Sequence, residues 1–226
     1  MAKLALLTHS DEQLPRRLRA ALDRALAQWF EVRVDKKPLP DSGFEAVVVL
    51  GGKMGAYEID AFPWLVEEKE FLRRQVDNSM PVLGICLGSQ LLAEALGGSA
   101  FLAPAPEVGV VPIQLTDAGK RHEVMRVIGD QVLCVHQDTF ELPPGAVLLA
   151  SSSLYPHAFE LGSAIGLQFH PEIDAIEAIQ AVSNEDAEQL FRAGVVGSDF
   201  ADQVRGAEAQ LESAAARLFD AWLASI

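Results

Sequence analysis

Basic residues are scarce in this sequence, and the scarcity excludes several kinds of partner. The chain has 18 lysines and arginines against 32 aspartates and glutamates, for a formal net charge of −14. Nucleic acids and anionic membranes bind to basic surfaces, which a chain this acidic is poorly equipped to form. We therefore expect neither nucleic acid nor membrane among the partners.

Long apolar runs are also missing. The chain contains no run of 18 apolar residues, which is about the length that a helix needs to cross a bilayer. Charged residues at positions 11, 12, 16 and 17 interrupt the N-terminus where a signal peptide would be apolar. Only two cysteines occur, which predicts a reducing, cytoplasmic location without a disulfide framework. The sequence alone leaves a Cys86–Cys134 bridge open.

Two cofactor patterns are absent as well. No cluster of histidines and cysteines has metal-ligand spacing along the chain, so the sequence predicts no metal site. No Walker-type phosphate loop occurs, because Gly51-Gly52-Lys53-Met54 has the wrong spacing. We expect no cofactor, and we expect any ATP-dependent synthesis to need a separate synthase subunit.

The most informative stretch that is present runs from Pro81 to Gly98, with the sequence PVLGICLGSQLLAEALGG. It predicts a short buried strand, a sharp turn around Cys86 and a helix opening at Ser89. Unpaired N–H groups and the helix dipole gather at such a helix start, where they favour a thiolate and can hold an oxyanion. Cys86 is therefore a candidate nucleophile.

A cysteine nucleophile needs a base, and the base needs an orienting group. The apolar run Ala164 to Phe169 predicts a strand that delivers His170 at its end, and Pro171 keeps that histidine extended. Glu172 lies two positions further on, close enough to accept the imidazole N–H. The remaining histidines at positions 9, 122 and 157 carry no signal beyond surface or loop placement, and Cys134 is interpreted as a core residue.

The pattern of strands and helices predicts an α/β fold, with a mostly parallel central sheet and helices on both faces. Gly52, Cys86 and His170 all follow strands, and the carboxyl ends of parallel strands meet at one edge. The expected elements are strands at 3–8, 30–34 and 45–50 and helices at 12–29 and 64–77. Residues 98–169 predict a small antiparallel excursion of short strands.

The last part of the chain, 174–226, predicts a helical extension of a single domain that spans 1–226. It holds ten acidic and three basic side chains, which is half of the net charge of the chain. Leu211, Ala215, Leu218, Phe219, Trp222 and Leu223 form an apolar stripe along it. We interpret it as a helical cap with a solvated acidic face, in preference to a surface that docks a partner.

Three motifs resemble the class I, triad-type glutamine amidotransferases: GICLGSQ around Cys86, FHPE around His170, and VVVLGGKMG at 47–55. HQDTF at 136–140 and LPPGA at 142–146 resemble the single-domain, GMP-synthase-like branch. The resemblance implies a flavodoxin-like fold and a triad of Cys86, His170 and Glu172. It also implies an oxyanion hole formed by the backbone N–H groups of Gly52 and Leu87.

The same resemblance implies a glutamine-like substrate and the residues that bind it. Gln90, one helical turn past Cys86, would contact the α-amino acid end of the substrate. Gly51, His136 and Gln137 would line the pocket, the last two through their backbone.

The leaving group and the acceptor stay open at this level. A glutaminase that supplies ammonia to a separate synthase is one interpretation, and a free-standing hydrolase of γ-glutamyl amides or peptides is another. His157 stands where relatives often carry glutamine, and Val110 stands where an aromatic residue is usual. A third interpretation, a fold retained as a binding module, is opposed by the intact triad. The oligomeric state is open too.

Overall fold

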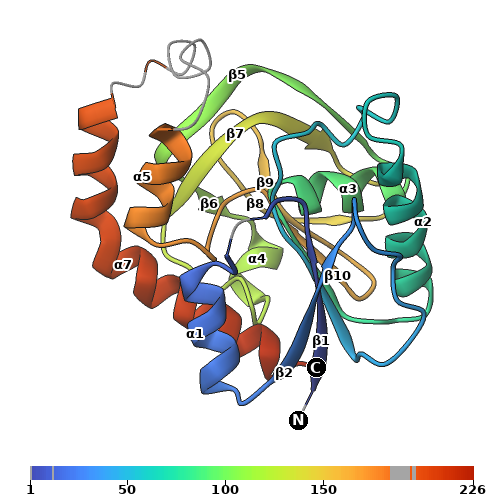
Figure 1. Ribbon diagram of the computed structural model, residues 1–226. Helices are drawn as coiled ribbons and strands as arrows, with labels where there is room; N and C mark the ends of the chain where they lie inside the picture. The colour runs from blue at the N-terminus through green and yellow to red at the C-terminus, as the bar shows by residue number, and fades with distance from the viewer. Residues whose placement is uncertain (1, 12, 184–193, 195–196) are drawn as a thin grey trace.

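The structure, a computed structural model, describes residues 2–11, 13–183, 194 and 197–226 (Figure 1). At its centre lies an eight-stranded sheet in the order β2-β1-β3-β4-β10-β9-β8-β6. The parallel strands are β2 (Gln28–Arg33), β1 (Lys3–Thr8), β3 (Ala46–Val49), β4 (Val82–Ile85) and β10 (Ala164–Leu167). The antiparallel strands are β9 (Pro156–Leu161), β8 (Val147–Ser151) and β6 (Gln114–Leu115).

Helices cover both faces of this sheet, because successive side chains of a buried strand point to opposite sides. Leu4 and Leu6 of β1 belong to a core cluster that includes residues of α1 (Arg16–Arg24) and α7 (Gly197–Leu223). Ala5 and Leu7 belong to a second cluster with α2 (Trp64–Asp77) and α3 (Leu87–Ala95). In Figure 1 these two helix pairs lie on opposite sides of the sheet. The predicted α/β fold with a mostly parallel sheet is confirmed.

The antiparallel excursion is present, but its strands are not short as predicted. β5 (Ser99–Pro112) has 14 residues and β7 (Gln131–Glu141) has 11, and the two pair in a separate sheet. Prolines at 104 and 106 suggested breaks in this region. They fall instead where the register shifts between Leu102 and Glu107, and an irregularity of this kind lets a strand accommodate residues without an N–H. A short helix, α4 (Asp117–Arg121), separates β6 from β7.

The first helix is shorter than the predicted 12–29, because its apolar periodicity runs on into a strand. Residue 12 lies outside the described residues, and α1 ends at Arg24. Leu26 then adopts a positive φ of 52°, which reverses the chain into β2. Trp29 therefore pairs with Leu4 in the sheet rather than lying on the helix. The second predicted strand also begins two residues early, at Gln28.

The C-terminal part is helical where it is described, in α5 (Ala175–Ser183) and α7, while 184–193 and 195–196 lie outside the described residues. Leu218, Phe219 and Trp222 of the predicted stripe are buried against the α1 side of the core. Arg17 of α1 forms a 2.6 Å ion pair with Glu208 of α7, which ties the two helices together. Within the described ranges, each helix is too short or too polar to cross a membrane.

Candidate active site

Cys86 sits in a strained turn between β4 and α3. Its φ of 53° and ψ of −112° place it outside the regions that a residue with a side chain normally adopts. Its N–H donates to the carbonyl of Leu167 over 2.8 Å, which holds the turn against β10. A Cβ on Gly88 would collide with the backbone of Val49, so only glycine lets the helix start approach β3 this closely. The helix begins at Leu87, two residues before the predicted Ser89, with Cys86 as its N-cap.

His170 follows β10, which ends at Leu167 rather than at the predicted Phe169. Its N–H donates to the carbonyl of Leu133 in β7 over 2.8 Å. Its side chain Nδ1 lies 2.7 Å from Oε1 of Glu172; the Glu172 side chain is buried, and that of His170 is 11% exposed. This contact fixes the orientation of the imidazole and leaves the buried Nε2 with no hydrogen-bond partner in the described part of the chain.

The charge of this pair is set by opposing effects. Burial by itself lowers the pKa of His170, because it disfavours the imidazolium. The carboxylate of Glu172 and the sulfur of Cys86 outweigh burial and raise this pKa well above its ordinary value. The pair therefore favours an imidazolium next to Cys86, as an activated cysteine nucleophile requires.

Glu172 is anchored to the first helix through its backbone. Its carbonyl accepts hydrogen bonds from the N–H groups of Arg17 and Leu18, at 3.1 and 3.3 Å. These belong to the first turn of α1, whose N–H groups lack intrahelical partners. The backbone of the residue that orients His170 is thus held by the start of α1.

The glycine loop after β3 brings a third element to the same place. A Cβ on Gly51 would lie 3.5 Å from Cε1 of His170 and 3.6 Å from Cβ of Cys86, so the Gly51 backbone is in van der Waals reach of both. Cys86, His170, Glu172, Gly51 and Gly52 all line one cavity of about 450 Å³. The three motifs that are separate in the sequence therefore converge at one edge of the sheet.

His9 lies at this site, although the sequence predicted only a surface or loop position for it. It is buried, its Nδ1 lies 3.1 Å from the carbonyl of Gly51, and its Nε2 lies 3.1 Å from the carboxylate of Glu68. Burial lowers the pKa of His9, but Glu68 and Gly51 raise it above its ordinary value. Both neighbours are acceptors, so the ring satisfies them fully only as an imidazolium. His9 follows β1, and the edge rule that located Cys86 would have found it.

The other residues predicted at the site have different surroundings. Leu87 opens α3, and no side chain caps the start of this helix. Gln90 is buried, and its Nε2 lies 3.3 Å from both the carbonyl of Asp138 and Oε1 of Gln168, so its amide is engaged inside the protein. Gln137 is half-buried in β7. The neighbouring Val135, rather than His136 or Gln137, lines the cavity.

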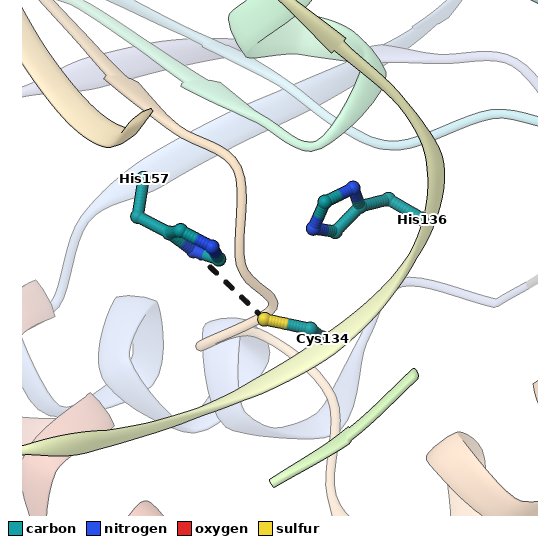
Figure 2. A group of neighbouring side chains, drawn as sticks. All are labelled: Cys134, His136 and His157. Carbon is teal, nitrogen blue, oxygen red and sulfur yellow. Dashed lines mark hydrogen bonds between the residues drawn. The ribbon is translucent and has the colours of Figure 1, made fainter. Parts of the chain in front are cut away.

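His136 takes part in a second Cys–His group, outside the cavity. Cys134 and His136 of β7 and His157 of β9 point toward one another (Figure 2), and ligand atoms of the three lie within 4.8 Å of one another. All three are buried, so the surface or loop placement expected for His157 is wrong, whereas Cys134 is a core residue as expected. Both cysteines are free. The spacing along the chain gave no sign of this cluster, because the pairing of distant strands creates it.

Comparisons with known proteins identify relatives of the chain. The family model for "Glutamine amidotransferase class-I" matches residues 13–186. The glutamine amidotransferase-like protein YfeJ of Salmonella typhimurium is 31% identical over 182 residues, which cover 76% of each chain. The GMP synthase of Helicobacter pylori is 35% identical over 131 residues, but these cover 57% of this chain and only 24% of the synthase.

A solved structure extends the similarity to the whole fold. The crystal structure of a glutamine amidotransferase from Thermotoga maritima superimposes with a TM-score of 0.85 at 26% sequence identity, covering 98% of both chains. The family model alone covers more than half of the sequence. The chain therefore belongs to the class I glutamine amidotransferase family.

Proposed function

We propose that the protein hydrolyses the side-chain amide of glutamine or of a glutamine-like substrate, with Cys86 as nucleophile. The observation that carries the proposal is the convergence of Cys86, the His170–Glu172 pair and the Gly51–Gly52 loop on one cavity. A nucleophile, an oriented base and backbone donors are the parts that acyl transfer from an amide needs.

The reaction has two halves. The Cys86 thiolate attacks the γ-carbonyl carbon, and the resulting oxyanion accepts hydrogen bonds from the N–H groups of Gly52 and Leu87. The His170 imidazolium gives its proton to the leaving nitrogen, the C–N bond breaks, and a γ-glutamyl thioester remains on Cys86. Neutral His170 then takes a proton from water, whose oxygen attacks the thioester carbon. The C–S bond breaks, glutamate leaves, and the Cys86 thiolate forms again beside the His170 imidazolium.

The second Cys–His group is the poorer candidate for this chemistry. Glu107 contacts both His136 and His157, so a Cys–His–carboxylate set can be drawn there as well. Cys134 is fully buried, however, and does not line the cavity at Cys86. Burial raises the pKa of the Cys134 thiol well above its ordinary value, which disfavours the thiolate that would attack. A substrate could reach Cys86 but not Cys134.

The fate of the released nitrogen defines two versions of the proposal. In the first, ammonia passes to a separate synthase subunit. The H. pylori GMP synthase supports this version, because the chain matches about a quarter of its length. In the second, the leaving group is an amine of a γ-glutamyl amide or peptide. The apolar side chains of Met54, Phe62 and Ile173 along the cavity favour this version, since ammonia needs no such surface.

The test is glutamate release by the purified chain from glutamine and from a panel of γ-glutamyl amides and peptides. Replacing Cys86 with alanine should abolish release from every substrate. A glutamine-mimicking affinity label, mapped by peptide mass spectrometry, should modify Cys86 and leave Cys134 untouched. Undiminished release by the Cys86→Ala variant, or labelling of Cys134 alone, would overturn the assignment. Preference for a γ-glutamyl amide over glutamine would select the second version.

A further inference from the structure

The buried side chains around Cys134 are polar, and the proposed hydrolysis gives them no role. Cys134 and His136 are two residues apart in β7, so their side chains share one face of the strand. Glu107 of β5 stands directly opposite His136 in the strand register. His157 approaches from β9, a strand of the other sheet. Four side chains from three strands thus meet between the two sheets.

The acid inside this cluster has no lysine or arginine partner in the described part of the chain. The carboxylate of Glu107 is 7% exposed, and its ion-pair partners there are His136 and His157. A bound cation would therefore complete the surroundings of this buried acid.

The hydrogen bonds of His136 leave a lone pair directed into the cluster. Its Nδ1 lies 2.9 Å from the carbonyl of Asp138, an acceptor, so Nδ1 carries the proton and donates it. In the neutral ring Nε2 is then an acceptor, and it is buried with no hydrogen-bond partner in the described residues. In this neutral ring Nε2 faces Oε2 of Glu107 across 3.3 Å, so two lone pairs point toward each other.

In His157 the two ring nitrogens exchange roles compared with His136, because Nε2 carries the proton and Nδ1 the lone pair. Its Nε2 lies 2.8 Å from Oε2 of Glu107, and its Nδ1 lies 3.9 Å from Sγ of Cys134. The Glu107 carboxylate accepts the Nε2 proton, which leaves Nδ1 as a lone pair beside the sulfur. Histidines that bind metals characteristically donate their second N–H to a carboxylate or a backbone carbonyl, and His157 and His136 show one case each.

We propose that Cys134, His136 and His157 form a buried binding site for a thiophilic transition-metal ion, with Zn²⁺ as the best fit. The ligands are Cys134 Sγ, His136 Nε2 and His157 Nδ1, and Glu107 orients His157 as its outer partner. A divalent ion bound by one thiolate, beside one carboxylate, leaves the cluster without net charge. Binding releases the Cys134 thiol proton, because the thiolate is the ligand.

The distances are close to those of a loaded site. Ligand atoms around a tetrahedral Zn²⁺ lie roughly 3.3–3.6 Å apart, given typical metal–nitrogen and metal–sulfur bond lengths. The Cys134–His157 contact of 3.9 Å is near this range, and the widest separation in the cluster is within 4.8 Å. Side-chain shifts of about 1 Å would therefore be enough to form the metal–ligand bonds. The bound ion would join β7 to β9, and so the small sheet to the large one.

The test is metal content and spectroscopy of the full chain. The protein is produced with added Zn²⁺, dialysed against a chelator and measured by mass spectrometry of the metal. In parallel it is refolded with Co²⁺ in a non-thiol reductant, so that a thiolate-to-cobalt absorption band reports a bound cysteine. We expect one metal ion per chain, the cobalt band, and a higher Tm with Zn²⁺ than without it.

Conservative variants separate the site from the rest of the protein. His136→Asn keeps an amide N–H near the Asp138 carbonyl but removes Nε2, and His157→Gln keeps a donor for Glu107 but removes Nδ1. Each should lower metal affinity by about tenfold or more, and Cys134→Ser should remove the cobalt band. Cys86→Ser, the matched variant at the other cysteine, should still bind the metal ion and show the thiolate-to-cobalt band. The proposal would be overturned if the wild-type protein bound no metal. It would also be overturned if Cys86→Ser lost the cobalt band while Cys134→Ser kept it.

Discussion

Replacement of Glu172 by glutamine isolates the charge of the group that orients His170. Glutamine has nearly the same shape, so the change removes a negative charge while it leaves the packing in place. The wild-type contact is 2.7 Å long and almost fully buried, and Glu172 is the strongest influence that raises the pKa of His170. The variant should therefore change the protonation of His170 rather than the fold.

The size of the effect follows from the strength of the contact. A hydrogen bond to a charged group contributes about 1.5–3 kcal/mol and a neutral one about 0.5–1.5 kcal/mol, so the variant loses roughly 1–1.5 kcal/mol. The pKa of His170 should therefore fall, because the imidazolium loses its carboxylate partner. Because Glu172 also fixes the tautomer of His170, kcat/KM should fall by about 10²–10⁴-fold.

The assay is glutamate release across a pH series that spans the titration of His170. The alkaline limb of the kcat/KM profile should move to lower pH, since the imidazolium of His170 is lost at lower pH. Glu160→Gln is the matched control, because Glu160 contacts His122 over 3.1 Å in a more exposed His–Glu pair away from the cavity. A Glu172→Gln profile that superimposes on that of the control would refute the role assigned to Glu172.

Three further changes test other parts of the molecule. Gly52→Ala should reduce kcat/KM, because the new Cβ would lie 2.6 Å from Cδ2 of Leu87, and alkylation of Cys86 by iodoacetamide should show that the thiol stays reactive. Glu68→Gln should lower the free energy of unfolding by about 1–3 kcal/mol. Its effect should be largest below about pH 6.5 and fade as pH rises through the raised folded-state pKa of His9, as urea titrations at several pH values would show. Trp222→Ala should lower the free energy of unfolding by about 3–5 kcal/mol in the same titrations, because this side chain of α7 is 2% exposed in the core. A loss below about 1 kcal/mol would mean that α7 does not unfold together with the rest of the protein.

The sequence predicted the parts of the molecule that depend on local signals. Buried strands such as Lys3–Thr8 appear as continuous apolar runs, and the elbow at Cys86 appears as a strand, a glycine-rich turn and a helix. The position of His170 followed from its place after an apolar run. These features need only a few neighbouring residues to be recognised.

The missed features depend on pairing between distant segments. Trp29 fits a helical periodicity equally well, and only its pairing with Leu4 assigns it to a strand. His9 and Glu68 are 59 residues apart and show no pattern until the fold joins them beneath the glycine loop. His157 meets Cys134 only because strands of the two sheets, β9 and β7, lie next to each other in the fold, and no spacing along the chain predicts that contact.

The attachment of Glu172 to α1 has a consequence for how the two ends of the protein communicate. The N–H groups of Arg17 and its neighbour hold the Glu172 carbonyl, and the side chain of Arg17 holds Glu208 in the middle of α7. A single residue therefore links the C-terminal helix to the acid beside His170. Three contacts, Glu208 to Arg17, Arg17 to Glu172 and Glu172 to His170, lead from α7 to the cavity, so we expect a molecule that docks on α7 to alter the proposed hydrolysis without entering the cavity.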